Sequence, residues 1–558
     1  MFSKVLIANR AEIAVRVART CKDLGVATVA VYSDADEGAR HTRLADDALQ
    51  LPGTASADTY LNIPALVDAA GASGAEAIHP GYGFLSENPS FAEAVIAAGL
   101  VWIGPPPEVL RAVGDKISAR RIAESAGVPV VPGLLEPVED PAVVLNFAAE
   151  HGYPIAVKAA GGGGGRGLKV ARDADEVDEA FAGARREAQA YFGDDRVYVE
   201  RYLDSPKHLE VQILAAGPDD ALWLGVRDCS LQRRHQKLVE ETPPPRLSER
   251  AADMGHAAVA LAKAVGYVNA GTVEMLVDGS DFYFLEVNAR LQVEHTVTEE
   301  VFGVDLVAAQ LLIAAGDELG FVQSDLSGRG HAIECRINAE DPGRGFAPTP
   351  GKLIRYVEPS GPGVRVDSGY GPGDQLPAAY DSLLAKVICH GSNREEARKR
   401  MLRALREMEI VGVGSTVAAH ELLLREPSFV EGSHTTTTVE ETGVLDSLLA
   451  QTTDAPQPEG VLLVDGRPVS LWNPAMSDSA TAAVSGAVSA GHVIAPMQGT
   501  VLKLWVTDGD TVKAGDPLIV LEAMKMETTI DADQEGSVSL RVDLGDSVVA
   551  GQLLAVIA

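Results

Sequence analysis

Two glutamates in the segment 271–295 have the spacing of a shared cation site. The segment consists of two apolar stretches around turn residues 278–281, a pattern typical of a β-hairpin. If Gly279–Asp281 form the loop, Glu274 lies opposite Glu286 on one face. At about 5 Å and an effective dielectric of about 20, the two carboxylates repel each other by about 3 kcal/mol. A shared cation removes this repulsion, and Mg²⁺ fits best because its carboxylate sites leave room for water and phosphate.

A polar row follows the second strand of this hairpin. If the alternation continues past Glu286, every second side chain projects to the same side, namely Asn288, Arg290, Gln292 and Glu294. A guanidinium group can hold a planar oxyanion by two contacts while a nearby carboxylate accepts a proton, as activation of a carboxylate-like substrate requires. The alternative is the solvated face of an amphipathic strand, which the neighbouring glutamate pair disfavours.

A glycine-rich run, Ala159–Gly167, follows an apolar strand that ends in Lys158. Each glycine in a regular element costs about 1 kcal/mol relative to alanine, so the run predicts a loop. Its backbone N–H groups can approach phosphate oxygens, with Lys158 neutralising the charge beside them. The run matches neither a Walker A sequence nor a dinucleotide fingerprint, and a plain flexible loop explains the run alone equally well.

A lysine near the C-terminus stands between two methionines, where two similar half-sequences meet. Gly499–Gly515 recurs, with one residue deleted, as Gly536–Gly551. The duplication predicts a small barrel of two equivalent sheets in which the chain turns at Ala523–Met526, so that Lys525 stands at an exposed tip. We interpret Lys525 as a covalent attachment point. The alternative, a solvated hairpin lysine between core methionines, does not explain the repeat.

The composition limits the class of protein. A chain of 558 residues predicts three to four domains at about 150 residues each. The net charge of −32 disfavours nucleic acid and anionic membrane as partners, because both require clustered lysine and arginine. The four cysteines have no metal-like spacing, and no uncharged apolar run reaches the roughly 18 residues of a membrane span. We therefore expect a soluble, cytoplasmic protein with reduced thiols.

The chain divides by pattern into an α/β region, a mixed region and an all-β tail. Short apolar strands alternate with helical stretches through residue 113, as in a doubly wound parallel sheet. Between residues 448 and 490 the composition shifts to Thr, Ala, Ser, Pro and Gly, most clearly in Ser477–Gly491, which predicts a tether. Within it, Val461–Trp472 has the pattern of a short hairpin.

These features together resemble the biotin-dependent carboxylases. Residues 1 to about 447 look like biotin carboxylase of the ATP-grasp superfamily, and roughly the last seventy are similar to a biotinyl domain, whose Glu-Ala-Met-Lys-Met motif is modified on its lysine. The segments that carry the resemblance of the first part are Leu6–Arg10, His79–Asn88, Gly114–Lys116, the glycine run, Arg227–Lys237 and Glu334–Asp341. Two departures are Ala11, where the family often has glycine, and Arg201, where lysine is common.

The resemblance implies an α/β plus α+β fold with a C-terminal all-β barrel-sandwich. Its implied parts are an N-terminal α/β domain (1–113), an ATP-grasp domain (114–330) with a mobile glycine-rich lid (about 131–203), a C-terminal carboxylase domain (331–447), a linker (448–490) and a biotinyl domain (491–558).

The resemblance also implies a role for each matching residue. Glu294 is the expected general base, Arg336 is expected to stabilise the biotin enolate, and Lys525 to carry biotin. The expected ATP ligands are Lys116, Lys158, Gly163, Gly164, Glu200, Leu203, His208, His235 and Leu276, with Lys237 also near the phosphates; the Mg²⁺ (or Mn²⁺) ligands are Glu274, Glu286 and Asn288; and the bicarbonate ligands are Lys237, Arg290, Gln292, Val293 and Glu294.

The implied activity is ATP- and bicarbonate-dependent carboxylation of biotin. No stretch remains for a carboxyltransferase domain, so we expect a separate β subunit that carboxylates an acyl-CoA, such as acetyl-CoA or propionyl-CoA, as in fatty acid biosynthesis. Biotin protein ligase and a second copy of the carboxylase part are further expected partners. Two alternatives are another ATP-grasp ligase, disfavoured by Lys525, and a non-enzymatic carrier, disfavoured by the intact Glu274, Glu286 and Glu294. The preferred acyl-CoA, the stoichiometry, an extra small subunit and docking by residues 461–472 stay open.

Overall fold

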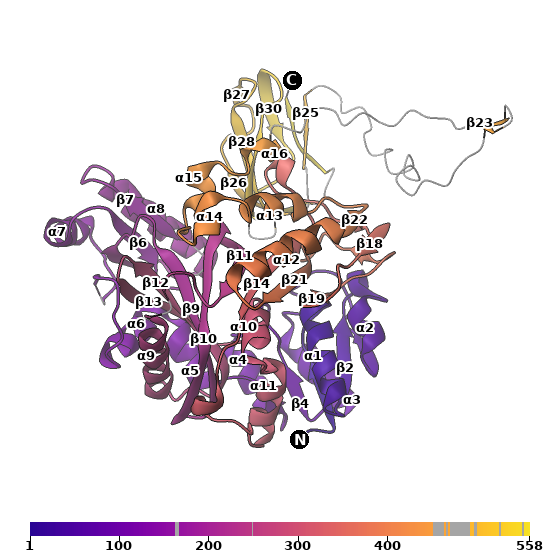
Figure 1. Cartoon of the computed structure of the whole chain (residues 1–558). Coiled ribbons are helices and arrows are strands. Elements are labelled where there is room, and N and C mark those ends of the chain that lie inside the picture. The colour runs from indigo at the N-terminus through magenta and orange to yellow at the C-terminus, as the bar shows by residue number, and fades with distance from the viewer. Residues whose placement is uncertain are drawn as a thin grey trace.

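The computed structural model (Figure 1) describes most of the chain. No helix among the described residues is long and apolar enough to cross a membrane. The described residues do not include Gly163, Gly164, Lys525 and most of the predicted linker. All four cysteines are described, and they are buried and free. The described residues are 1–134, 136–161, 167–247, 249–449, 463–464, 467–468, 491–495, 499–523, 526–548 and 552–557.

The N-terminal region is the expected doubly wound domain. Its five strands are all parallel, in the order β3-β2-β1-β4-β5. Successive residues of β1 enter two different cores, because Leu6 packs with α3 and α4 while Val5 packs with α1. The elements are β1 (Lys4–Ile7), α1 (Ala11–Asp23), β2 (Ala27–Tyr32), α2 (Arg40–Leu44), β3 (Asp47–Gln50), α3 (Ile63–Ser73), β4 (Ala77–His79), α4 (Pro89–Ala97), β5 (Val101–Trp102) and α5 (Pro107–Gly114).

An eight-stranded sheet forms the centre of the molecule (Figure 1). Its order is β13-β12-β9-β10-β11-β14-β21-β19, and every neighbouring pair is antiparallel. The sheet continues across the predicted boundary at residue 330 through the pairing of β11 with β14. Its strands are β9 (Lys207–Gly217), β10 (Asp220–Arg233), β11 (Gln236–Thr242), β12 (Asn269–Asp278), β13 (Asp281–Asn288), β14 (His331–Asn338), β19 (Val364–Ser368) and β21 (Leu383–Gly391).

The β12–β13 hairpin has the predicted glutamate pairing but a different turn. Asp278 pairs with Asp281, so the loop is the two residues Gly279 and Ser280 rather than Gly279–Asp281. A bulge between Glu274 and Met275 shifts the register by one residue and brings Glu274 opposite Glu286. The expected pair therefore forms because the bulge compensates for the shorter loop.

Helices and short strand pairs surround the central sheet. For example, α12 packs its buried Met401 and Leu405 in one core with Val387 of β21. The helices are α6 (Lys116–Ser125), α9 (Ala251–Ala264), α10 (His295–Phe302), α11 (Leu306–Ala315), α12 (Arg394–Glu407), α13 (Val417–Leu423), α14 (Pro427–Glu431), α15 (Thr438–Thr442) and α16 (Asp446–Leu449). The short pairs are β15 (Glu340–Asp341) with β16 (Ala347–Pro348), β17 (Gly351–Lys352) with β20 (Gln375–Leu376), and β18 (Arg355–Val357) with β22 (Glu409–Val411).

The segment predicted as a lid has a core of its own. Its three-stranded sheet, in the order β7-β6-β8, carries two helices, and their apolar side chains form a cluster that includes Val144, Val157 and Phe181. Such a separate core is what a segment that moves as a unit requires. The elements are α7 (Pro141–His151), β6 (Ile155–Ala159), β7 (Leu168–Ala171), α8 (Val177–Phe192) and β8 (Val197–Arg201).

The C-terminal unit is a sandwich of two four-stranded sheets, as the duplication predicted. The sheets have the orders β25-β32-β30-β27 and β29-β28-β26-β31, so each half-sequence contributes one strand to each sheet. In the β28–β29 hairpin, Ala523 pairs with Met526. The strands are β25 (His492–Ile494), β26 (Gly499–Leu504), β27 (Thr511–Val512), β28 (Pro517–Ala523), β29 (Met526–Asp531), β30 (Gly536–Leu540), β31 (Ser547–Val548) and β32 (Leu553–Ile557).

Part of the predicted hairpin in the linker is also present. Two short strands, β23 (Leu463–Val464) and β24 (Arg467–Pro468), pair antiparallel within the segment 461–472.

Candidate active site

A row of charged residues crosses four strands of the central sheet. Glu286 on β13 pairs in register with Glu274 on β12, which pairs with Glu210 on β9 and through it with Arg227 on β10. Register neighbours project from the same face, so three carboxylates and one guanidinium lie side by side. Arg227 is fully buried and forms an ion pair with Glu210. The sheet thus concentrates negative charge that cations must balance.

Glu274 is the most densely bonded of these carboxylates. Its Oε1 accepts hydrogen bonds from Lys237 at 2.9 Å, Asn288 at 2.8 Å and Gln292 at 3.1 Å. Its Oε2 lies 2.8 Å from His208 Nε2. Burial alone would raise the pKa of Glu274, but Lys237 and His208 hold it well below its ordinary value. Glu274 is therefore ionised although only 5% of it is exposed.

Lys237 joins three carboxylates from different elements. Its Nζ lies 2.7 Å from Glu210 Oε2, 2.9 Å from Glu274 Oε1 and 2.7 Å from Glu294 Oε1. Burial alone would lower the pKa of Lys237, but these carboxylates raise it well above its ordinary value. Lys237 is thus a fixed positive charge at the centre of the cluster.

The predicted continuation of the strand to Glu294 is wrong. A loop, rather than a strand, brings the polar side chains of the row together. β13 ends at Asn288, and residues 289–294 lead into α10. Arg290 donates from Nη2 to Asn288 Oδ1 at 3.0 Å and from Nη1 to Gln292 Oε1 at 3.1 Å. Its Nε donates to Glu87 Oε2 at 2.8 Å. The loop folds back because these side-chain bonds replace the sheet ladder.

Glu294 lies between Lys237 and a second cation, Arg336 of β14. Arg336 Nη2 donates to Glu294 Oε2 at 2.9 Å, and its Nε donates to Glu240. Burial alone would raise the pKa of Glu294, but Lys237 and Arg336 hold it well below its ordinary value. For Glu240, burial and the nearby Glu294 outweigh Arg336 and raise the pKa to about 7. One guanidinium thus bridges a strongly acidic carboxyl and a weakly acidic one.

Two further lysines predicted to contact nucleotide also pair with carboxylates. Lys116, the first residue of α6, lies 3.0 Å from Glu286 Oε2. Lys158 on β6 forms an ion pair with Glu200 on β8, which also pairs with Arg120. Each lysine is therefore neutralised by a carboxylate, and this ion pair has to open before the lysine binds a phosphate group or the carboxylate binds a divalent cation.

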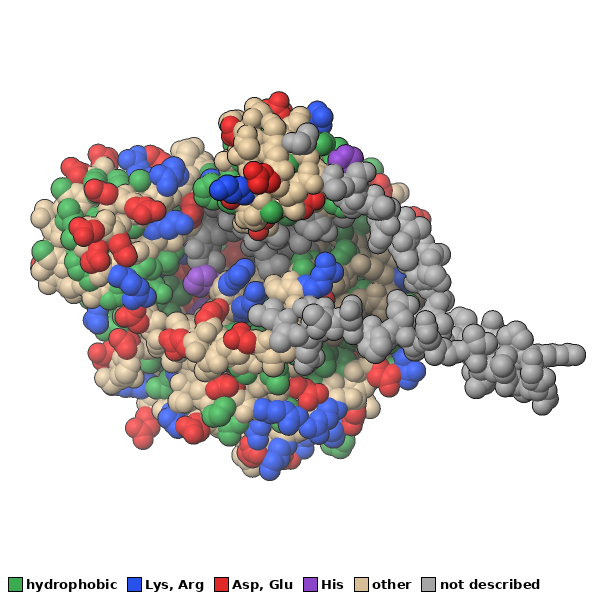
Figure 2. Space-filling view, turned by 90° about the horizontal axis from the view of Figure 1, so that it is seen from above, with side chains coloured by type: hydrophobic (Ala, Val, Ile, Leu, Met, Phe, Trp, Pro, Cys, Tyr) green, Lys and Arg blue, Asp and Glu red, His purple; other side chains and the backbone are tan. Residues whose placement is uncertain are grey.

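The other predicted nucleotide residues that the structure describes lie on or next to strands that carry the residues above. Leu203 is buried just after β8, and Leu276 pairs in register with His208. His235 is exposed in the β10–β11 turn, where its backbone φ is +65°. Seen from above, basic side chains and a histidine lie in a hollow beside the lid (Figure 2).

The donor set fits a divalent cation. Glu274 and Glu286 lie opposite each other in register, and Asn288 offers an amide oxygen that accepts from Arg290. The ligand atoms of His208, Glu210 and Glu274 also lie within 4.8 Å of one another. Oxygen ligands from two carboxylates and an amide match the preference of Mg²⁺.

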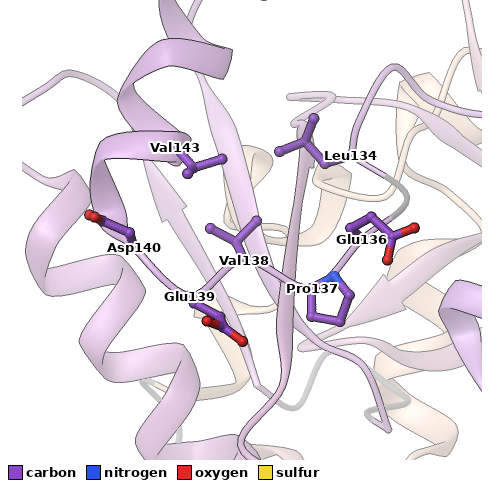
Figure 3. A pocket seen from close by; sticks show the side chains of 7 residues that line it. All are labelled: Leu134, Glu136, Pro137, Val138, Glu139, Asp140 and Val143. Carbon is purple, nitrogen blue, oxygen red and sulfur yellow. The ribbon is translucent and has the colours of Figure 1, made fainter.

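A surface hollow on the lid lies apart from this chemistry. It is lined by Leu134, Val138 and Val143 with three acidic residues at its rim, and Figure 3 shows their side chains around it. None of the predicted site residues lines it. The charged cluster, rather than this hollow, is therefore the candidate active site.

The sequence prediction missed several residues of the cluster. Each of them forms an ion pair with a predicted site residue or with another residue that the prediction missed. They are Glu210, Arg227, Glu240 and Glu87. Arg227 begins the segment Arg227–Lys237, but the resemblance assigns no role to this residue. Glu210 and Glu240 look like single charges in strands. Only the pairing of distant strands reveals their position.

Four family models match the chain in succession. They are "Biotin carboxylase, N-terminal domain" over residues 1–110, "Carbamoyl-phosphate synthase L chain, ATP binding domain" over 115–322, "Biotin carboxylase C-terminal domain" over 334–441 and "Biotin-requiring enzyme" over 491–557.

Curated relatives and solved structures agree with these matches. The chain is 45% identical to the biotin-dependent acyl-coenzyme A carboxylase alpha3 subunit of Mycobacterium leprae, over 99% of this chain and 98% of the relative. It is 50% identical to the biotin carboxylase of Haemophilus influenzae, over 77% and 97%. The biotin carboxylase domain of Hydrogenobacter thermophilus 2-oxoglutarate carboxylase, solved as a dimer with MgADP, ADP and bicarbonate, superimposes with a TM-score of 0.77 at 44% identity, over 80% and 99%.

Proposed function

The chain belongs to the biotin-dependent carboxylases, as an ATP-grasp biotin carboxylase joined to a biotin-carrying domain, and we propose that it supplies carboxylated biotin to an acyl-CoA carboxyltransferase. The family reaction uses ATP and bicarbonate to carboxylate biotin in the presence of Mg²⁺. The observation that carries our assignment of roles is the Lys237 centre, which joins Glu210, Glu274 and Glu294 at 2.7–2.9 Å.

Bicarbonate would bind in the loop before α10. The two terminal nitrogens of Arg290 and the amide of Gln292 offer donors to a planar anion, with Lys237 beside them. Glu294 would be the base, although its low pKa makes it a weak one while Lys237 and Arg336 both bond to it. An anion that takes over the contact with Lys237 would raise the basicity of Glu294, so substrate binding would itself activate the base.

ATP would bind by an exchange of ion pairs. Glu274 and Glu286 would hold the metal, which frees Lys237 and Lys116 for the phosphate oxygens. Lys158 and His208 would complete the positive surroundings, with Glu200, Leu203 and Leu276 at the adenine and His235 nearby. When bound, Mg²⁺ would supply positive charge that neutralises the negative charge developing on the phosphate groups. Gly163 and Gly164 would cover the phosphates and exclude water.

Biotin would react beside Arg336. This guanidinium is fixed by Glu240 and Glu294, and 18% of its side chain is exposed. A fixed, always charged donor can stabilise negative charge on the ureido oxygen of biotin. Lys525 would be the attachment residue, after modification by biotin protein ligase.

The proposed partner is a separate carboxyltransferase β subunit. The Mycobacterium leprae relative, which aligns along nearly the whole chain, is named as the alpha3 subunit of an acyl-coenzyme A carboxylase. An acyl-CoA such as acetyl-CoA or propionyl-CoA would be the acceptor, consistent with a role in fatty acid biosynthesis. The carboxylase part, which we divide into 1–113, 114–330 and 331–447, would also associate with a second copy. Residues 448–490 would tether the carrier domain, 491–558.

ADP release tests the carboxylase reaction. The purified protein should release ADP from MgATP when both bicarbonate and free biotin are added, and no release would overturn the proposed roles. Co-purified transferase with a panel of acyl-CoA thioesters then tests the partner. Carboxylation of none of them, by a protein that still releases ADP, would overturn the acyl-CoA assignment alone.

A further inference from the structure

Lys386 of β21 is a fully buried lysine next to the proposed bicarbonate loop. Its Nζ donates to the carbonyl oxygen of Val293 at 2.8 Å and lies 2.8 Å from Glu12 Oε1. In the sheet, Lys386 pairs in register with Arg336, so both cations project from the same face. A buried lysine is costly unless it is paired, and here its charge is directed at the peptide bond that precedes Glu294.

The partner of Lys386 comes from the N-terminal domain. Glu12 lies in the first turn of α1 and is 2% exposed, and Tyr82 donates its hydroxyl group to the second oxygen of the same carboxylate. Burial alone would lower the pKa of Lys386, but Glu12, Glu334 and Asp367 raise it above its ordinary value. The lysine is therefore charged, and its ammonium group is held by both Glu12 and the Val293 carbonyl.

The backbone before Glu12 is strained. Ala11 has a φ of +51°, a left-handed conformation that a residue with a Cβ atom rarely adopts. Gly369 packs so closely against this turn that a Cβ atom there would lie 2.5 Å from the amide nitrogen of Glu12. Strain of this kind persists where the surrounding structure requires one conformation, so the first turn of α1, which carries Glu12, is held in place by its surroundings.

We propose that Lys386, anchored by Glu12, is a positioning residue that fixes the peptide between Val293 and Glu294 and thereby the bicarbonate site. The contact with the Val293 carbonyl sets the orientation of this peptide plane, from which the side chain of Glu294 extends toward Lys237 and Arg336. The inference rests on the proposed function of this loop. It adds a link by which the N-terminal domain, through Glu12, controls a loop of the central domain.

Steady-state kinetics of Lys386→Met separate positioning from stability. Methionine is one atom shorter than lysine and has no donor, so the loop loses its anchor while most of the side-chain volume in the core stays filled. We expect the KM for bicarbonate to rise and kcat to fall. The combined effect should lower kcat/KM by about 10- to 100-fold, because small misplacements of reacting groups have effects of this size. The KM for ATP should change little, since Lys386 contacts none of the proposed nucleotide residues that the structure describes.

Arg394→Met is the matched control. Arg394 forms a comparable ion pair with the buried Glu241 at 2.7 Å, and its other hydrogen bonds go to the backbone of Phe429 and Val430 rather than to the loop before α10. It should lower the melting temperature, as Lys386→Met does, yet leave the KM for bicarbonate unchanged. Equal changes in that KM for both variants would overturn the proposal.

Glu12→Gln provides a second test that preserves side-chain shape. It weakens the anchor without removing Lys386, so a smaller rise in the KM for bicarbonate is expected. If Lys386→Met does not fold, Glu12→Gln decides, and an unchanged KM for bicarbonate overturns the proposal. A wild-type protein with normal bicarbonate-dependent ADP release in the same assay shows that such a failure concerns Lys386 and not the proposed function.

Discussion

The central sheet and the C-terminal sandwich present their reactive groups in opposite ways. The sheet buries its charges in register, where Glu274 and Lys237 are each bonded to several neighbours. The sandwich has an apolar core that includes Val501 and Leu521, and its proposed reactive residue, Lys525, lies in the sequence between the strands β28 and β29. Proton transfer requires groups held in a fixed, poorly solvated geometry, whereas a carrier requires reach. The two regions therefore divide activation and transport of the carboxyl group.

We expect the largest effect from the substitution that removes the proposed base from the charged cluster of the central sheet. Glu294→Gln keeps the shape of the side chain and one of its two acceptor oxygens but cannot accept a proton from bicarbonate. Bicarbonate-dependent ATP hydrolysis should fall by about 10²- to 10⁴-fold, while ATP binding is retained. Turnover near that of the wild type would contradict the role of Glu294, and ATP binding measured by calorimetry controls for a disordered site.

Stability should respond differently to loss of a charge in the two regions. Arg227→Met leaves the buried Glu210 with one of its two cationic partners removed, and should lower the free energy of unfolding by about 3–5 kcal/mol. Lys503→Met in the sandwich removes only a lysine lying over the exposed Trp505, and should cost about 0.5–1 kcal/mol. Urea denaturation of both variants measures this, and equal losses would remove the contrast between the regions.

The local patterns of the sequence predicted the outline of both regions. The alternation around Glu274 and Glu286 predicted their pairing, and the repeat predicted the symmetry of the sandwich. Glu210 and Glu240 were missed because their neighbours come from strands far away in the chain. A local pattern contains no information on which distant strands pair or in which register.

The loop before α10 shows a second limit of local patterns. Alternating residues after Glu286 predicted a strand, but side-chain bonds of Arg290 and Gln292 replace the strand by a loop that brings the same residues together. Lys386 gave no signal at all in the sequence, since a lysine in an apolar strand usually has an exposed end.

The pH dependence of stability reports the weakly acidic carboxyl of the cluster. The folded-state pKa of Glu240 is about 7, above the ordinary 4.5, because burial favours the neutral form. The folded protein therefore binds an extra proton between those values, and stability falls as pH rises through this window. The stability of Glu240→Gln relative to that of the wild type should therefore increase as the pH rises from about 5 to 7.5. Urea denaturation across this range measures the difference, and a difference independent of pH would contradict the raised pKa.

We expect the smallest effect on stability from the substitution that relieves the backbone strain at the start of α1. Ala11→Gly removes the Cβ atom from a left-handed residue and should raise the free energy of unfolding by about 1 kcal/mol. Ala14→Gly, within the same helix, should lower it by about 1 kcal/mol. Thermal denaturation distinguishes them, and stabilisation by neither or both would show that Ala11 is not strained.

Transfer of labelled bicarbonate onto the protein tests most directly whether the two regions act together. Full-length biotinylated protein, given MgATP and labelled bicarbonate, should acquire an acid-labile label. Lys525→Arg should acquire none, yet should still release ADP when free biotin is added. An unlabelled wild-type protein, or equal labelling of Lys525→Arg, would contradict the account.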